Sequence, residues 1–114
     1  MATGDLYDFA SVVLNGSGNG TAKVGPLSAR ESWTPAVISV AATSNTKEAT
    51  CQIYAGAAAQ APYFLDSTYA GSSGDSTGRG AAKTLRVGQY VWAVWTGGDA
   101  GAVATVTVNG TKEI

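Results

Sequence analysis

Apolar and polar residues alternate with a period of two along much of the chain, and this pattern constrains the fold more than any other feature. In the segment 37–43, Ile38, Val40 and Ala42 fall on one face and the intervening residues on the other. The segment 102–109 alternates in the same way. Alternation rich in Val and Thr predicts half-buried strands. No stretch of ten or more residues keeps an apolar stripe at helical spacing, so we predict an all-β chain.

Turn-forming residues divide the chain into short strands. The Gly- and Asn-rich segments 15–20 and 97–101 are predicted to close hairpins, and the segment 44–48 to join two further strands. The Ala-rich segment 55–62 is bracketed by a glycine and a proline, which predicts a loop or a single helical turn. The predicted strands are 6–14, 21–27, 30–43, 49–55, 63–70, 83–88, 90–96 and 102–109.

Seven or eight short strands linked by Gly-rich turns predict an antiparallel β-sandwich, of which a jelly roll is one form. With 114 residues, the chain fits a single domain over 1–114. Residues 1–9 are acidic and aromatic, which suits either an arm that docks on a neighbour's sheet edge or a plain first strand. The Gly- and Ser-rich segment 71–82 predicts a long loop, either solvated or ordered by a neighbouring subunit.

Charge and composition exclude several classes of function. The chain has seven basic and eight acidic residues, so it offers no broad basic surface for nucleic acid or for an anionic membrane. The first nine residues hold two acidic and no basic side chains, which predicts no secretory signal peptide. The longest aromatic-aliphatic run, 90–95, is too short to span a bilayer.

The residues that carry most enzyme chemistry are scarce. Histidine is absent, which removes the usual triad base and zinc ligand. The single cysteine, Cys51, shares a face with Ile53 and is predicted to be a small buried side chain. Asp66, Asp75 and Asp99 lie in or beside predicted loops, but their spacing matches no dense calcium-binding motif. We therefore expect no catalytic, cofactor-binding or metal-binding residues and no enzymatic activity.

The predicted strand 90–96 is apolar on both faces, with Tyr90 and Trp92 on one side and Trp95 on the other. Such a strand should be covered on both sides. The cover could be the chain's own loops, a subunit or partner interface, or the rings of a sugar stacked on the aromatic residues. The candidate interface residues are Tyr7, Phe9, Tyr90, Trp92 and Trp95.

The C-terminal segment 84–112 contains the run Val-Trp-Thr-Gly-Gly-Asp-Ala-Gly-Ala-x-Ala-Thr-Val-Thr-Val. Three further stretches accompany it: Cys51-Gln-Ile-Tyr, Leu65-Asp-Ser-Thr-Tyr-Ala-Gly-Ser and the segment 20–33. In these stretches the chain resembles small virion structural proteins of tailed phages that infect actinobacteria. The motifs are structural, and no functional residue is carried over from that group.

The resemblance implies a non-enzymatic β-sandwich that is made in the host cytoplasm and assembled in many copies on a virion. Our first hypothesis is a capsid decoration protein that binds and stabilises the major capsid protein shell, most simply as a homotrimer. A minor tail or tail-tip protein with tail proteins as partners is the alternative. A carbohydrate-binding module for host attachment is a third hypothesis from a different class.

Overall fold

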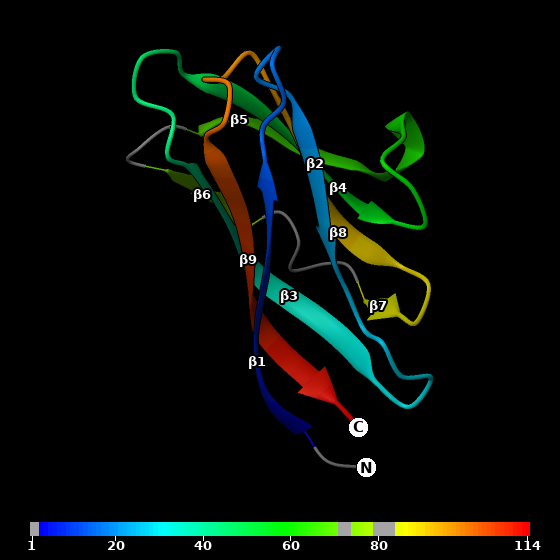
Figure 1. Cartoon of the computed structure of the whole chain (residues 1–114). Coiled ribbons are helices and arrows are strands. Elements are labelled where there is room, and N and C mark those ends of the chain that lie inside the picture. Colours follow the sequence, from blue (N-terminus) through cyan, green and yellow to red (C-terminus); the bar gives the residue numbers. More distant parts are fainter. Residues whose placement is uncertain (1–2, 71–73, 79–83) are drawn as a thin grey trace.

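The computed structural model describes residues 3–70, 74–78 and 84–114, and strands dominate these ranges (Figure 1). The only helical element among them is the 3-10 turn η1 at Ala61–Tyr63, which overlaps the end of the segment 55–62 that was predicted to be a loop or at most a single turn. No helix within the described ranges is long and apolar enough to cross a membrane. The elements are β1 (Thr3–Val13), β2 (Gly20–Val24), β3 (Ser32–Ala42), β4 (Ala49–Gly56), η1 (Ala61–Tyr63), β5 (Phe64–Ala70), β6 (Asp75–Thr77), β7 (Leu85–Arg86), β8 (Tyr90–Thr96) and β9 (Val103–Glu113).

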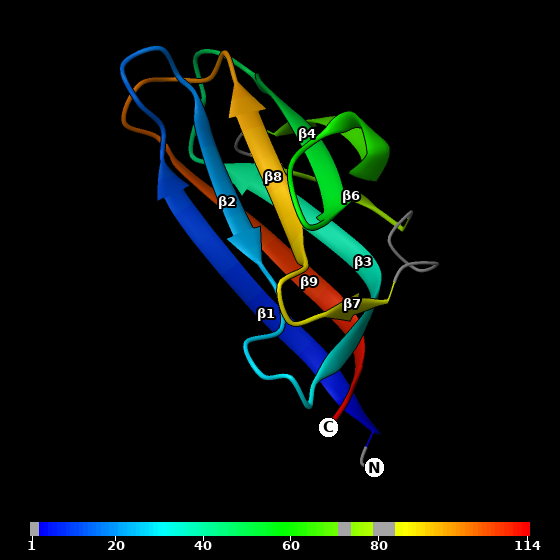
Figure 2. The same ribbon diagram turned by 90° about the vertical axis from the view of Figure 1, so that its right-hand side faces the viewer.

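The strands form two antiparallel sheets. Sheet A has the order β1-β9-β3-β6, with β7 also paired to β3, and sheet B has the order β2-β8-β4-β5. The pairings are nested along the chain, because β1 pairs with β9, β2 with β8, β3 with β6 and β4 with β5. A long hairpin rolled into two layers gives this order, which is the jelly-roll topology (Figures 1 and 2). The predicted β-sandwich is confirmed.

Each of the eight predicted strands corresponds to an observed one. One observed strand, β6, was not predicted, because Asp75–Thr77 lies inside the segment 71–82 that was expected to be a loop. It pairs with the centre of β3, opposite Ile38 and Val40, so a neighbouring strand supplies the hydrogen bonds that its composition does not suggest. The parts of the predicted loop at 71–73 and 79–82 lie outside the described residues.

The two predicted hairpins are wrong. Segments 15–20 and 97–101 each connect a strand of one sheet to a strand of the other, and 44–48 does the same. The nested pairing explains the difference. Among the described strands, only β4 and β5, at the centre of the nest, follow each other in the chain and also pair with each other. Turn chemistry predicted where the chain reverses, but it holds no information on which sheet the next strand joins.

These inter-sheet connections are bonded to one another at one end of the sandwich. Gly98 N–H donates to Gly18 O at 3.0 Å. The Asp99 carboxylate accepts hydrogen bonds from the backbone N–H groups of Asn45, Thr46 and Lys47 at 2.9–3.0 Å. One acidic side chain thereby closes the β3–β4 connection against the β8–β9 connection.

The N-terminal segment is a strand of sheet A. β1 pairs with β9 in unbroken register from Thr3, opposite Glu113, to Val13, opposite Val103. Both ends of the chain therefore lie at the same end of the molecule (Figure 1). The docking arm considered for residues 1–9 is thus, from residue 3 onward, the plain first strand that was its alternative.

The core lies between the two sheets and follows the alternation of the strands. Its largest side chains are two tryptophans, Trp33 and Trp95, of which Trp95 is fully buried. Cys51 and Ile53 are also fully buried on the inner face of β4, as predicted. Burial of this apolar set contributes most of the stability of such a fold. Other buried residues of the core strands include Ile38, Val40, Ala49, Val91, Ala93, Ala104, Val106 and Val108.

Candidate functional site

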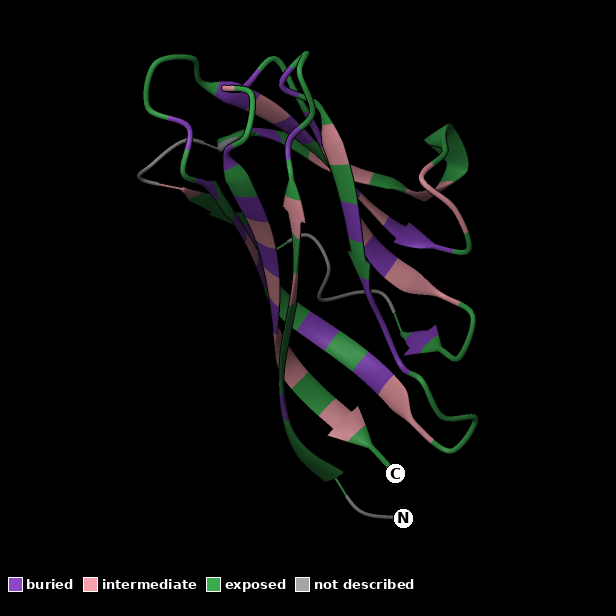
Figure 3. Cartoon of the chain, viewed as in Figure 1, coloured by how far each residue is buried: buried purple, intermediate pink, exposed green. Residues whose placement is uncertain are grey.

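The outer face of sheet A, which points away from sheet B, is built from alternate residues of neighbouring strands. Phe9 stands opposite Thr107, Thr107 opposite Ser39, and Ser39 opposite Ser76. One row of side chains thus crosses four strands. Figure 3 shows the matching alternation of buried and less buried residues along β9 and β3. Successive strand residues point to opposite faces, so the same alternation that fills the core also fixes this surface.

Uncharged side chains make up this outer face. Three of the apolar ones are strongly exposed, with Tyr7 at 68%, Val13 at 63% and Phe9 at 57%. Hydroxyl groups lie beside them, and Ser11 and Thr105 share a hydrogen bond of 2.9 Å across β1 and β9. We define the outer face of sheet A as Tyr7, Phe9, Ser11 and Val13 of β1, Val37, Ser39 and Ala41 of β3, Ser76 of β6, and Val103, Thr105, Thr107 and Asn109 of β9.

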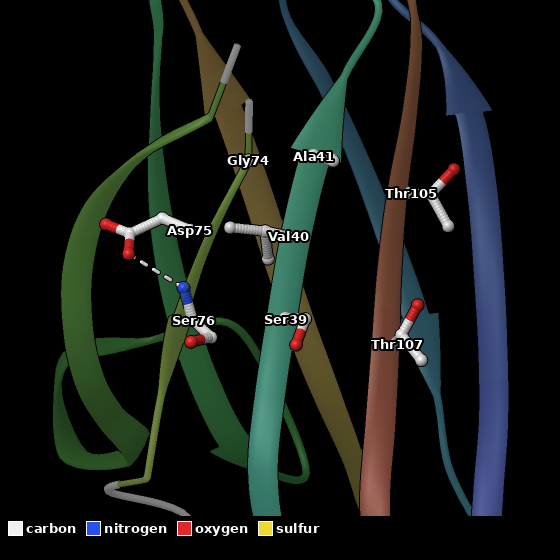
Figure 4. Close-up of a pocket in the computed structure, with 8 residues that line it drawn as sticks. All are labelled: Ser39, Val40, Ala41, Gly74, Asp75, Ser76, Thr105 and Thr107. Atoms are coloured by element: carbon white, nitrogen blue, oxygen red, sulfur yellow. Dashed lines mark hydrogen bonds between the residues drawn. The ribbon is translucent and has the colours of Figure 1, made fainter. Parts of the chain in front are cut away.

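Two open hollows lie on the outer face of sheet A. The larger has a volume of about 400 Å³ and spans β3, β6 and β9 (Figure 4). The second, of about 340 Å³, shares Ala41 and Thr105 with it, so the two are continuous along β3 and β9. The small side chain at Ala41 leaves room between the strands. The larger hollow is lined by Ser39, Val40, Ala41, Gly74, Asp75, Ser76, Thr105 and Thr107.

The aromatic residues of β8 lie on the opposite side of the molecule, on the outer face of sheet B. The rings of Tyr90 and Trp92 meet edge to face, with centroids 5.6 Å apart. Lys23 Nζ lies 4.4 Å from the Tyr90 centroid and 5.0 Å from that of Trp92. Trp92 Nε1–H donates to Gly56 O at 3.1 Å. The rings are therefore held by contacts within the chain, including a cation over both of them.

The structure separates the five candidate interface residues into three places. Tyr7 and Phe9 are exposed on the outer face of sheet A, and Tyr90 and Trp92 are half-buried on sheet B. Trp95 is fully buried between the sheets, so its selection as an interface residue is wrong. Its side of β8 points into the core. The alternation in the sequence assigned Trp92 and Trp95 to opposite faces of β8, but it did not indicate which face points into the core.

The sequence-based selection missed most of the outer face of sheet A, including Val13, Val37 and Val103. The alternation of 102–109 did place Val103 and Thr105 together on one face. The missing information was the pairing of β9 between β1 and β3, which joins three such faces into one surface.

Two titratable groups have environments that define their chemistry. Burial raises the pKa of the Cys51 thiol to about 12, against a smaller opposing effect of a backbone hydrogen bond from Val94. Backbone hydrogen bonds, that of Thr46 foremost, hold the pKa of Asp99 below its ordinary value. Cys51 thus stays a protonated thiol and Asp99 a carboxylate at neutral pH. Within the described part of the chain, no three His, Cys, Asp or Glu residues are grouped to hold a metal ion.

Comparison of the sequence with models of protein families gave no match, and comparison with curated proteins gave none either. The candidate site therefore rests on surface chemistry. Its most distinctive feature is the outer face of sheet A, where exposed aromatic and aliphatic side chains alternate with hydroxyls. A surface of this kind binds another surface by apolar contact and neutral hydrogen bonds.

Proposed function

We propose that the chain is a non-enzymatic structural protein of a phage virion, specifically a capsid decoration protein that binds the major capsid protein. The outer face of sheet A would be the contact surface, and this uncharged, partly aromatic face is the observation that carries the proposal. Exposed apolar patches rimmed by polar groups mark sites of protein association. The virion context comes from the resemblance of the C-terminal segment 84–112 and the stretches that accompany it.

The chemistry of the outer face suits a protein partner. Tyr7 and Phe9 are aromatic side chains of the kind that anchor interfaces. None of the residues that define this face is charged, and burying charge is the costly step in covering a polar surface. The carboxylate at the rim of the larger hollow, Asp75, already accepts a hydrogen bond from Ser76 N–H. The Ser and Thr hydroxyls rotate to donate or accept hydrogen bonds with a partner. The hollow beside Ala41 offers room for a side chain of the partner.

The size of the outer face suits repeated, individually weak contacts. From Tyr7 to Val13 the face is about 20 Å long, and its four strands make it about 20 Å wide. That footprint is well below the roughly 800 Å² that each partner buries in a stable complex. A single contact of this size binds weakly. Many equivalent contacts on a symmetric shell, or three in a homotrimer, would supply avidity.

The fold does not distinguish a virion protein from a carbohydrate-binding module, whereas the surface does. Jelly rolls occur in viral capsid proteins and in lectins, so the topology supports a virion role and sugar binding equally, by analogy alone. The two tryptophans of β8 argue against sugar binding. Trp95 is buried and Lys23 lies over the Trp92 ring, so neither ring offers a free face on which a sugar could stack, and a protein partner is favoured. A minor tail or tail-tip protein would use the same outer face against tail proteins and remains the alternative.

Peptide mass spectrometry on purified phage particles tests the proposal, with heads separated from tails before digestion. The major capsid protein serves as the internal standard for copy number. We expect this chain in the head fraction at a copy number comparable with that standard. Recovery of a few copies with the tails would overturn decoration in favour of the tail alternative. Absence from both fractions would overturn the virion proposal.

A further inference from the structure

Edge strands expose backbone donors and acceptors that can pair with a strand of another chain. Besides the two-residue strand β7, which also pairs with β3, the edges are β1 and β6 in sheet A and β2 and β5 in sheet B. On three of these four strands, an Asp carboxylate accepts a hydrogen bond from the backbone N–H of the next residue. The three pairs are Asp8 with Phe9 N–H at 2.8 Å on β1, Asp66 with Ser67 N–H at 2.9 Å on β5, and Asp75 with Ser76 N–H at 2.8 Å on β6.

The Phe9 N–H points to the open side of β1. Leu14 N–H donates to Ala102 O at 2.8 Å, next to the β1–β9 ladder. Hydrogen-bonded positions alternate along an antiparallel pair, so the even-numbered residues of β1 bond to β9. Phe9 occupies an odd position, and its N–H therefore faces away from β9. The Asp8 carboxylate occupies a donor that an added strand would need.

The other edge of sheet A has the same geometry. Thr43 N–H donates to Val103 O at 2.9 Å, which places the odd-numbered residues of this part of β3 in bonds with β9. Even-numbered residues such as Val40 therefore bond to β6. Ser76 stands opposite Ser39, so its N–H faces the open edge, where the Asp75 carboxylate accepts it (Figure 4).

We propose that Asp8 and Asp75, on the two edges of sheet A, are edge guards that block strand addition, so that the protein associates through the outer face of sheet A and not through the edges of that sheet. A hydrogen bond from an N–H to a carboxylate is stronger than one to a neutral acceptor, so a strand carbonyl competes poorly for the same donor. The carboxylate also brings a charge to the edge, a known obstacle to edge pairing. This inference does not depend on the identity of the partner.

The edge of β1 gives the cleanest test, because Asp75 also contacts the Thr68 hydroxyl. Asp8→Ala removes both the acceptor and the charge, and Asp8→Asn removes the charge but keeps an acceptor oxygen. Asp5→Ala is the matched control, since Asp5 lies on the same strand, is exposed and has no hydrogen bond within the described ranges. Each purified chain is compared with the wild type by light scattering over a concentration series, after circular dichroism has verified the fold.

We expect Asp8→Ala to at least double its weight-average mass at concentrations where the wild type and Asp5→Ala do not change. Asp8→Asn, which keeps only a neutral acceptor, should lie between Asp8→Ala and the wild type. An unchanged mass for Asp8→Ala would overturn the proposal. Equal association of Asp8→Ala and Asp5→Ala would also overturn it, because the loss of charge would then explain the effect without the hydrogen bond.

Amide hydrogen exchange on the wild type tests the same idea without any substitution. By the alternation above, the amides of Tyr7, Phe9 and Ser11 all face the open edge of β1, and Phe9 is the one bonded to a carboxylate. We expect Phe9 to exchange about fivefold more slowly than Tyr7 and Ser11 after correction for intrinsic rates, as one net hydrogen bond implies. Equal rates would overturn the proposal, even if Asp8→Ala failed to fold.

Discussion

Phe9 on β1 and Thr107 on β9 stand directly opposite each other on the outer face of sheet A. The Phe9 ring is 57% exposed and lies beside the hydroxyl of Thr107 on β9, a strand in the interior of the sheet. On the inner side of β9, Val106 and Val108 are fully buried. The central strand of sheet A therefore supports the core with one face and presents the proposed contact surface with the other.

Introducing a charge at Phe9 should weaken attachment without unfolding the chain. We expect Phe9→Glu to bind particles that lack the protein at least about tenfold more weakly, as loss of an interface anchor implies. The free energy of unfolding should change by no more than about 0.5 kcal/mol, because the side chain is exposed. Binding is measured by co-sedimentation and stability by urea denaturation.

Tyr69→Glu is the matched control for Phe9→Glu. Tyr69 is 63% exposed but belongs to β5 in sheet B. Attachment of Tyr69→Glu should equal that of the wild type. If instead Tyr69→Glu lost attachment while Phe9→Glu kept it, the contact surface would lie on sheet B.

Asp99 should make stability depend on pH in the acid range. Its pKa is lower in the folded chain than the ordinary value of 3.8, so the folded state favours the carboxylate. The resulting stabilisation is complete above pH 3.8 and is lost as the pH falls below it, through the folded pKa. We expect the melting temperatures of wild type and Asp99→Ala to differ clearly at neutral pH and to converge in strong acid. A constant difference across this range would contradict the role assigned to the carboxylate.

Two glycines with nearly equal φ angles should respond differently to alanine. Gly18 and Gly97 have φ of 76° and 75°, where a side chain is strained. A Cβ at Gly18 would also lie 1.9 Å from Gly98 O, whereas a Cβ at Gly97 would meet nothing within 4 Å. We expect Gly97→Ala to cost about 1–2 kcal/mol in urea denaturation and Gly18→Ala clearly more. Equal losses would show that the close approach of the two connections contributes nothing.

Cys51 should be inert in the native protein. Burial raises its pKa from 9.0 to about 12, so at a given mildly alkaline pH its thiolate is about a thousandfold scarcer than in the unfolded chain. We expect a thiol-specific reagent to modify the native chain only as fast as the chain unfolds, and to modify it rapidly in denaturant. Rapid stoichiometric modification without denaturant would place Cys51 outside the core.

The strands could be predicted from the sequence because their signal is local. The alternation in 37–43 and 102–109 reflects residues that are exposed on one side and buried on the other, and β3 and β9 lie where it indicates. The pairing of strands is not local. The 97–101 turn resembles a hairpin turn, yet β8 and β9 belong to different sheets.

The candidate site was predicted in part for the same reason. Tyr7 and Phe9 were selected for their side-chain type and are exposed, whereas Trp95 was selected on the same ground and is buried. An aromatic residue fits a core and an interface equally well. Only the layering of the two sheets decides between them, and it depends on contacts between strands that are far apart in the sequence.

Hydroxyl-radical footprinting of the free chain and of intact phage particles tests the central claim most directly. The chain carries reactive aromatic residues on both outer faces, with Tyr7 and Phe9 on sheet A and Tyr69 on sheet B. We predict that Tyr7 and Phe9 are protected in the particle while Tyr69 reacts as in the free chain. Protection of Tyr69 with unchanged reactivity of Tyr7 and Phe9 would contradict docking through the outer face of sheet A.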